Sequence, residues 1–408
     1  MKKILIHSLI FSPDGVSTAY LYNDIALAFQ RQGYEVFVVS TTPHFNVVPE
    51  QLERQPLRWG VWGLFKKSNY NGIEVYHVPQ KKFKSTLLRL VGFLYWHIVS
   101  FFLTLSIRNV DVILSPSPPL TIGQMNLWLG RLKGCKVIYN VQEVYPDILG
   151  MNEGFAYNFL SRMEHRVYAK SDAVTTIDKI FYDTIAPRFK DVSKLHVVPN
   201  FVDTELYHPD TGHEGLPEEL FPSTQGLKVL YAGNIGLMQD WQPLVDLAVR
   251  THELEIDYFV IGEGAMKSWL EQEKQEKNLT HLHILPYQRR ELMPQILDYS
   301  DIQFIFMKPG VDRQGFPSKV YTVMACGKPL LISSGEDTPI VNFLSGVGCA
   351  KIVTSSGNGA EEMAEWLTTV TRDELGRMGE AGLKEIEGKY TKEVVTGKYI
   401  EIVESLFE

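Results

Sequence analysis

The residue best placed for chemistry in this chain is Lys319, at the start of a predicted helix. Before it come the apolar run IQFIFM, typical of a buried strand, and a loop rich in glycine and proline. Ser318 is a typical N-cap residue, and KVYTVMAC continues as a buried helix that stops at Gly327. The free N–H groups and the positive dipole of a helix start favour an anion, and Lys319 adds a full charge. The pattern predicts a phosphate site, although a strand-loop-helix unit with an incidental lysine would look the same.

A second set of candidate residues follows strands in the first half of the chain. Gly15 precedes a predicted helix, where a residue without a side chain lets the backbone approach a ligand. Gln142, Glu143 and Asp147 follow the strand-like run KVIYNV, at the edge where open α/β sheets bind ligands. Glu143 is therefore a candidate cleft residue. The plain alternatives are a turn glycine and a solvated loop carboxylate.

The second half of the chain repeats the arrangement of strand, glycine loop and helix. LYAGNIG contains Gly233, Asn234 and Gly236, and VIGEGAM contains Gly262 and Gly264. Such glycines let backbone N–H groups reach a phosphate, but each short motif is a weak signal taken alone.

These elements must be positioned by two α/β domains, each with a doubly wound parallel sheet. A chain of 408 residues is too long for one core, and a linker of low periodicity divides it. The sequence predicts four segments: a first Rossmann-like domain over 1–208, a linker over 209–226, a second Rossmann-like domain over 227–388, and a helix over 389–408 that packs back on the first domain.

Composition excludes several classes of protein. With 45% hydrophobic residues the chain is globular, and a net charge of -8 argues against a general nucleic-acid binder. Cys135, Cys326 and Cys349 are widely spaced in apolar contexts, which indicates buried thiols in a reducing compartment. The opening MKKILIHSLIFS predicts a first strand and no signal peptide.

One segment of the first half is unusually apolar. Lys81, Lys82, Lys84 and Arg89 stand ahead of about twenty mostly apolar residues that end near Arg108. Three interpretations compete: a transmembrane span, an internal helix, and a helix with one face on the sheet and a cationic end at an anionic membrane. Arg89, His97, Ser100 and Ser106, and the position of the run between two strands of a sheet, argue against a span. We favour the third interpretation.

Four segments together resemble a known family. HVVPNFVDTELYHP, LYAGNIG, VIGEGAM and GFPSKVYTVMACGKPLLIS, in this order and spacing, are similar to segments of the retaining glycosyltransferases of the two-domain GT-B fold, family 4. The resemblance covers nearly the whole chain. It is strongest to the subgroup of bacterial exopolysaccharide and O-antigen assembly, including the colanic-acid-type enzymes.

The resemblance implies a UDP- or GDP-sugar donor held mainly by the second domain. The glycine loop at Gly15 and the helix start at Ser318 would then close on its diphosphate. The donor-binding residues that the resemblance implies are Gly15, Gly233, Asn234, Gly262, Gly264, Gln314, Gly315, Phe316, Ser318, Lys319 and Thr322.

The sequence departs from the family pattern in two places. Most members carry two glutamates where this chain has Gln314 and Thr322. Many also carry an arginine and a lysine in the loop that here reads NIGLMQD. With those cations absent, Lys319 becomes the main candidate to neutralise the leaving diphosphate, and Lys308 and Arg313 are possible substitutes in the same region.

The implied chemistry needs neither metal nor cofactor. Breaking a sugar–diphosphate bond builds negative charge on the phosphate, which N–H dipoles and a cation stabilise, and no Asp-x-Asp motif stands out. In retaining enzymes of this fold the departing phosphate takes the proton of the acceptor. The resemblance therefore implies Lys319 and Glu143 as the catalytic residues, with Glu143 as an acceptor-positioning or electrostatic group and not a required nucleophile. The implied acceptor is a saccharide on a polyprenyl diphosphate, so we expect a cytoplasmic enzyme bound peripherally to the inner face of the plasma membrane.

Two rival functions remain at this stage. UDP-sugar 2-epimerases share the two-domain fold but normally use acid–base carboxylates and histidine. A sugar-nucleotide-binding relative without activity would explain Gln314 and Thr322.

Overall fold

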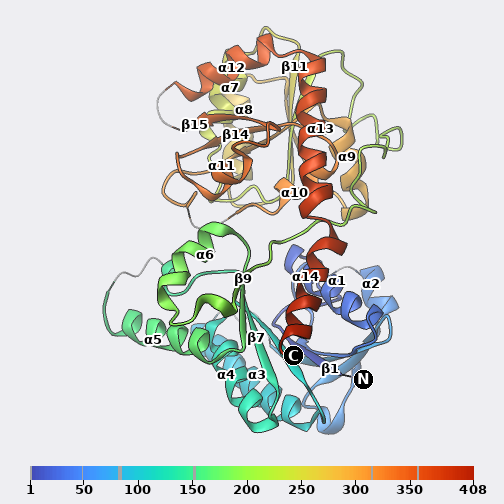
Figure 1. Cartoon of the computed structure of the whole chain (residues 1–408). Coiled ribbons are helices and arrows are strands. Elements are labelled where there is room, and N and C mark those ends of the chain that lie inside the picture. The colour runs from blue at the N-terminus through green and yellow to red at the C-terminus, as the bar shows by residue number, and fades with distance from the viewer. Residues whose placement is uncertain (1, 48, 81–84, 150–152, 314–315, 356–357) are drawn as a thin grey trace. The chain divides into compact units, whose positions relative to one another are not determined.

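The computed structural model describes residues 2–47, 49–80, 85–149, 153–313, 316–355 and 358–408. They form two compact units, residues 1–200 with 393–408 and residues 201–392 (Figure 1). The chain therefore leaves the first unit after Asn200, earlier than the predicted domain end at 208. The reason is that the segment after Phe201 already belongs to the second unit: Val202 bridges to Thr391, and the buried Tyr207 packs in that unit's core.

The first unit is built on a nine-stranded sheet in the order β3-β4-β5-β2-β1-β6-β7-β8-β9. Strands from β5 to β9 in that order pair in parallel, and only the edge formed by β3, β4 and β5 is antiparallel. The strands are β1 (Lys3–His7), β2 (Glu35–Thr41), β3 (Arg58–Trp59), β4 (Lys66–Tyr70), β5 (Ile73–Val78), β6 (Val112–Pro116), β7 (Lys136–Val141), β8 (Ala173–Thr176) and β9 (Leu195–Val197).

The antiparallel edge contains two strands, β3 and β4, that the sequence analysis does not predict. Asn71 and Gly72 join β4 to β5, and both have positive φ angles, 49° and 92°. An Asn-Gly pair with this geometry makes the tight turn that suits the twist of a hairpin. The Asn-Gly signal was present in the sequence and was overlooked.

Helices cover both faces of this sheet, and two neighbouring residues of β7 show which helix lies where. Side chains alternate between faces along a strand. Tyr139 lies under α4 and α5, whereas Asn140 bonds Tyr22 of α1 and Tyr399 of α14. The helices of this unit are α1 (Ser17–Arg31), α2 (Pro49–Arg54), α3 (Thr86–Ser106), α4 (Leu120–Lys133), α5 (Phe155–Lys170), α6 (Lys179–Ile185) and α14 (Lys392–Ser405), with short 3-10 turns at Val61–Gly63, Asp147–Leu149, Ala186–Arg188 and Val192–Lys194.

The last helix, α14, belongs to the first unit although it follows the second in sequence. Val395, Tyr399 and Val403 are buried, and Asn140 Nδ2 donates to the Tyr399 hydroxyl at 2.9 Å. The helix was expected over 389–408. The structure ends α13 at Lys389 and starts α14 at Lys392, with Tyr390 and Thr391 between them.

The second unit has a six-stranded, wholly parallel sheet in the order β12-β11-β10-β13-β14-β15. The strands are β10 (Leu227–Ala232), β11 (Ile256–Ile261), β12 (Leu282–Leu285), β13 (Ile302–Phe306), β14 (Leu330–Ser334) and β15 (Ala350–Thr354). The helices are α7 (Gln242–Arg250), α8 (Lys267–Glu276), α9 (Met293–Tyr299), α10 (Lys319–Ala325), α11 (Pro339–Leu344), α12 (Gly359–Thr369) and α13 (Arg372–Lys389), with a 3-10 turn at Arg290–Leu292.

The central strands of both sheets are mostly buried, since each sheet has apolar clusters against its helices, whereas the edge strands β3, β4 and β15 are partly exposed. Buried parallel strands explain why the sequence shows continuous apolar runs instead of alternation. The predicted α/β class with two doubly wound parallel sheets is confirmed.

Candidate functional site

Two glycine loops of the second unit lie against each other at the carboxyl ends of β10 and β11. Gly233 N–H donates to the Ile261 carbonyl at 2.9 Å, and Ile235 N–H donates to the Glu263 carbonyl at 2.9 Å. Gly262 has a φ of 149°, and a Cβ there would lie 1.9 Å from the Gly233 carbonyl oxygen. Glycine is therefore required at 262 by close backbone packing.

This packing changes the role expected for the glycine amides. The N–H of Gly233 is used by Ile261, and the N–H of Gly262 donates to the Leu285 carbonyl at 3.1 Å. Neither group is left for a phosphate in this structure. What the glycines provide is a surface without side chains, and a Cβ on Gly264 would strike the Ile235 carbonyl 2.2 Å away.

Lys319 comes to this surface from the start of α10. Its Nζ donates to the Ala232 carbonyl at 3.0 Å and lies 3.4 Å from the centre of the Tyr231 ring. A Cβ on Gly233 would meet the same ammonium at 2.6 Å. The structure thus brings together Gly233, Asn234, Gly262, Gly264 and Lys319, all of which the sequence predicted as donor-binding.

The surroundings of Lys319 disfavour its charge. The residue is only partly covered, but its ammonium end is enclosed, and burial lowers the pKa of Lys319 to about 7. Among the described residues no carboxylate forms an ion pair with it. A buried lysine with an aromatic ring, a carbonyl and no acidic partner is suited to an anionic ligand that would restore its charge.

The other predicted residues of this segment have mainly structural contacts. Ser318 precedes α10 as expected, but its side chain makes no capping bond. Thr322 Oγ1 donates back to the Lys319 carbonyl at 2.8 Å. Phe316 packs edge-on against Phe343 and near Tyr321 in the core. Gln314 and Gly315 lie outside the described residues.

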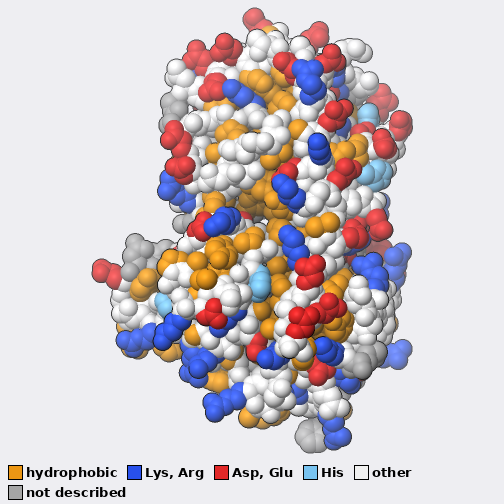
Figure 2. Space-filling view, viewed as in Figure 1, with side chains coloured by type: hydrophobic (Ala, Val, Ile, Leu, Met, Phe, Trp, Pro, Cys, Tyr) orange, Lys and Arg blue, Asp and Glu red, His pale blue; other side chains and the backbone are white. Residues whose placement is uncertain are grey.

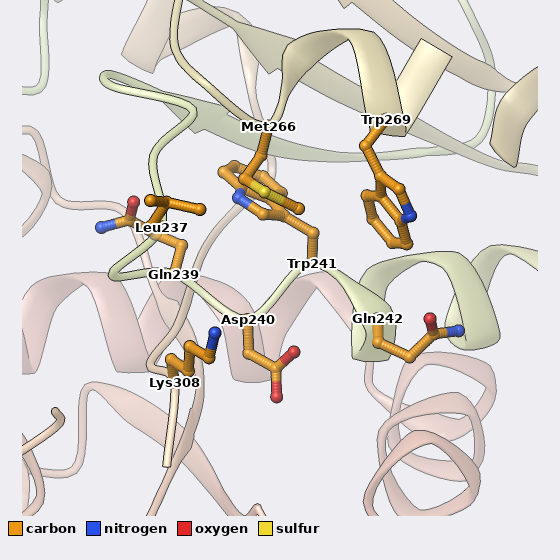
Figure 3. Close-up of a pocket in the computed structure, with 8 residues that line it drawn as sticks. All are labelled: Leu237, Gln239, Asp240, Trp241, Gln242, Met266, Trp269 and Lys308. Atoms are coloured by element: carbon orange, nitrogen blue, oxygen red, sulfur yellow. The ribbon is translucent and has the colours of Figure 1, made fainter. Parts of the chain in front are cut away.

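A small cavity of about 130 Å³ lies beside the loop after β10 (Figure 3). Met266 and Trp241 form its apolar side, and the side chains of Lys308 and Asp240 lie next to each other across from them. Burial raises the pKa of Asp240, and the charge of Lys308 partly opposes that rise. Lys308, a possible substitute cation, is thus associated with a carboxylate, unlike Lys319. The other substitute, Arg313, is exposed, with a long contact of 3.5 Å to the Glu336 carbonyl.

Glu143 and Gly15 belong to the first unit. Glu143 follows β7 and is half-buried, and burial raises the pKa of its carboxyl, while a 3.5 Å contact from the Tyr145 hydroxyl opposes the rise. Gly15 N–H donates to the Phe45 carbonyl at 2.9 Å, so this amide too is used within the fold. Closure of Gly15 on the donor diphosphate stays a prediction.

The clearest residue that sequence reasoning missed is Tyr231. Its ring lies under the Lys319 ammonium, and its hydroxyl donates to the Asn234 carbonyl at 2.8 Å, which supports the glycine loop. A tyrosine inside an apolar strand gives no signal of this role in sequence. Among the described residues there is also no group of three or more His, Cys, Asp or Glu side chains that could hold a metal.

Solved structures define the class to which this architecture belongs. HepE from Anabaena, in complex with UDP, is 12% identical and aligns with a TM-score of 0.73 over 99% of this chain and 100% of that chain. Sucrose-phosphate synthase from Thermosynechococcus elongatus is 12% identical with a TM-score of 0.75 over 100% of this chain and 99% of that chain. Both likenesses concern the fold, which is the GT-B fold of glycosyltransferases.

Sequence comparison then gives the family. The family model described as Glycosyltransferase Family 4 matches residues 19–206, and the one described as Glycosyl transferases group 1 matches residues 216–384. The putative colanic acid biosynthesis glycosyl transferase WcaI of Escherichia coli (strain K12) is 22% identical over 355 residues, 83% of this chain and 84% of that protein. The chain belongs to the GT-B glycosyltransferases of family 4, which confirms the resemblance seen in the sequence.

Proposed function

We propose that this glycosyltransferase moves a sugar from a UDP- or GDP-sugar to a polyprenyl-diphosphate-linked saccharide during the assembly of a bacterial cell-surface polysaccharide. The observation that carries the proposal is the Lys319 ammonium, enclosed beside the glycine loops with no acidic partner in the part of the chain that the structure describes. The presence of UDP in the HepE structure and the polysaccharide named for WcaI support this choice of donor and pathway.

The proposed reaction proceeds with retention and without a metal ion. The bond from the anomeric carbon to the diphosphate oxygen breaks, and the hydroxyl oxygen of the acceptor bonds to that carbon from the same face. The proton of the acceptor moves to the departing phosphate. Lys319 stabilises the negative charge that develops on the diphosphate, which is the largest electrostatic demand of the step.

Glu143 has the role of positioning the acceptor in this proposal. Burial raises the pKa of its carboxyl because it removes water from the ionised form. A hydroxyl group of the acceptor that donates a hydrogen bond to this carboxylate would stabilise the ionised form. Because the polyprenyl carrier resides in the cytoplasmic membrane, the proposal includes a cytoplasmic enzyme that works peripherally at the inner membrane face.

A thermal-shift screen of UDP-, GDP- and dTDP-sugars, followed by transfer assays with lipid-linked acceptors, tests the proposal. We expect the sugars of one nucleotide class to raise the midpoint of thermal unfolding, because a ligand that binds only the folded state stabilises that state. Anomeric NMR of the product should show the configuration of the donor, and EDTA should leave the rate unchanged. Inversion, dependence on a metal, or an acceptor without lipid would each contradict the corresponding part.

The departures at Gln314 and Thr322 favour one second candidate, a sugar-nucleotide-binding relative without activity. Binding of a nucleotide sugar with neither transfer nor hydrolysis, over a set of lipid-linked acceptors, would support it. Conversion of the donor alone into an epimer would instead indicate a 2-epimerase.

A further inference from the structure

The helix α3 exposes an apolar face where a soluble protein normally places polar residues. Its inner face packs on the sheet, with Trp96 and Leu103 buried beside β2 and β5. Two of the polar residues of the helix, Ser100 and Thr104, are on this buried side. The outer stripe is apolar and exposed: Leu87, Leu90, Val91, Leu94, Ile98, Phe102 and Leu105. A helix of the surface layer usually has the opposite distribution.

The two helices next to α3 continue this apolar surface. Lys133 of α4 donates to the Leu105 carbonyl of α3 at 3.2 Å, and α5 packs against the other side of α4. On α4, Trp128 is 52% exposed and Leu132 is exposed one turn later. On α5, Phe155 is 88% exposed, and Phe159 follows one turn later. We call the outer side of these three helices the α3–α5 face.

Cations accompany the apolar side chains on this face. The three helices contain six Lys or Arg residues and one acidic residue: Arg89, Arg131, Lys133, Arg162, Arg166, Lys170 and Glu164. Glu164 does not contribute an acidic surface, since its side chain is 1% exposed and paired with Arg188 at 2.8 Å. The face is cationic on a chain of net charge -8. Figure 2 shows Lys and Arg side chains gathered over α4 and α5.

We propose that the α3–α5 face docks on an anionic phospholipid bilayer, with the helices in the membrane plane. Large contiguous apolar surfaces mark interaction sites, and the combination of exposed Trp, Phe and Leu with Arg and Lys suits the boundary between head groups and acyl chains. Exposed arginines add attraction to anionic lipids. A protein partner for an apolar face of this charge would need a matching acidic surface, whereas anionic lipids supply the charge uniformly.

Docking in the plane also explains a helix that is long and apolar enough to span. Leu87–Ser106 has a mean hydropathy of 1.6, and by length and composition it could cross a membrane. To span, it would have to leave the sheet and expose Trp96, which is fully buried, and break the contact of His97 with Thr121 at 3.0 Å. In the plane, both faces of α3 keep apolar surroundings. Lys81, Lys82 and Lys84 lie outside the described residues, and the proposal does not rest on them.

Vesicle co-sedimentation of the full chain tests this surface. We expect binding to phosphatidylcholine vesicles that contain phosphatidylglycerol, and weaker binding without the anionic lipid. The double variant Ile98→Glu/Phe102→Glu should lower the partition coefficient at least about tenfold, since it removes two large apolar groups and adds two repelled charges. Arg162→Gln/Arg166→Gln should lower binding only to the anionic vesicles. About 0.5 M salt should likewise lower binding to the anionic vesicles, because salt screens the attraction between the cations and the lipid head groups.

Matched changes elsewhere separate docking from general surface effects. Val249→Glu/Leu254→Glu replaces two exposed apolar residues of the second unit, and Arg250→Gln/Lys384→Gln removes two exposed cations there. Both should bind vesicles as the unchanged chain does. All four changed side chains on the α3–α5 face are exposed, so the midpoint of thermal unfolding should not change. A loss of vesicle binding in these variants is then due to the changed surface and not to unfolding.

Three results would overturn the proposal. The first is unchanged vesicle binding of Ile98→Glu/Phe102→Glu. The second is resistance of the bound protein to carbonate extraction, which indicates a membrane span. The third is a concentration-dependent dimer that Ile98→Glu abolishes, in a protein that does not bind vesicles. The proposal deepens the proposed function, because the acceptor is membrane-bound, but the assay contains no donor or acceptor. Lipid binding and sugar transfer can therefore fail separately.

Discussion

At the residue scale, the environment of Lys319 combines attraction and cost. The Tyr231 ring and the Ala232 carbonyl both favour an ammonium, yet burial outweighs them and lowers the pKa to about 7. An anion that enters the site supplies the negative charge that the Lys319 ammonium lacks as a partner among the described residues. The attraction between the two is strongest in the transition state, because bond breaking increases the negative charge on the diphosphate.

Replacing Lys319 should therefore affect the reaction more than the fold. We expect Lys319→Ala to lower kcat/KM about 30- to 1,000-fold. This corresponds to a loss of roughly 2–4 kcal/mol of transition-state stabilisation, because one preorganised charge contact is removed. Transfer from radiolabelled donor to lipid acceptor measures this. Lys384→Ala, at an exposed position of α13, is the control and should be neutral. Unchanged turnover in Lys319→Ala would refute its role.

The lowered pKa of Lys319 predicts a pH dependence of nucleotide affinity. Below pH 7 the free protein already carries the charge, whereas above it binding a diphosphate must take up a proton. UDP or GDP affinity should fall by up to about tenfold per pH unit above 7. Isothermal titration calorimetry in buffers of different ionisation enthalpy measures the proton uptake. Lys319→Arg stays charged over this range, so its affinity should vary little with pH.

The same shift has a defined sign for stability. The folded pKa of about 7 lies below the ordinary value of 10.5, so between these values the unfolded chain binds more protons. The free energy of unfolding therefore rises as pH increases through this window. Below pH 7 the cost of burying the charged Lys319 ammonium is fully present.

At the element scale, the loops after β10 and β11 depend on close backbone contact. Gly262→Ala would place a methyl group 1.9 Å from the Gly233 carbonyl oxygen at a φ of 149°. We expect a loss of roughly 2–4 kcal/mol of unfolding free energy, because the neighbour is backbone and cannot rotate away. Urea denaturation measures the loss, and nucleotide affinity should fall with it.

A second glycine of the same unit gives the control for this change. Gly376 lies inside α13, and a Cβ there meets nothing within 4 Å. Gly376→Ala should be neutral or stabilise by about 0.5–1 kcal/mol, as alanine favours helix over glycine. Equal effects of the two substitutions would show that contact between the loops does not limit stability.

At the scale of the whole molecule, the chain returns to its first unit at the end. A chain that stops at Lys392 loses Val395, Tyr399, Ile402 and Val403, all of which are buried. Each such side chain contributes about 1.5–3 kcal/mol, so together they approach the whole stability of a typical domain. We expect calorimetry to show that the transition of the first unit is lost or strongly lowered, while that of the second unit remains.

A shorter truncation provides the comparison. Stopping after Ser405 removes the partly exposed Phe407 and its contact with Lys2, 3.8 Å from the ring centre. Such an exposed contact contributes about 0.5–1 kcal/mol, so both transitions should remain. Two unchanged transitions in the chain that stops at Lys392 would contradict the assignment of α14 to the first unit's core.

Much of this arrangement could be read from the sequence. Buried parallel strands produce continuous apolar runs, and glycine or proline marks the loops between them, so the parallel strands of both sheets were predictable. The start of α10 at Lys319 was predictable as well, because Pro317 disfavours a helical conformation in the residue before it and Ser318 suits a helix start. The hairpin turn at Asn71 and Gly72 was equally readable and was missed.

Contacts between distant segments were decided only by the tertiary structure. The amides of Gly233 and Gly262 bind carbonyls of neighbouring strands, and Tyr231 lies under Lys319, although 88 positions separate the two. The pKa of Lys319 follows from that enclosure. Likewise, Phe102 and Trp96 are similar apolar residues of one helix, and one is 64% exposed while the other is fully buried. Sequence specifies what each side chain is, whereas burial depends on which other segments cover it, and those segments are brought together only by folding.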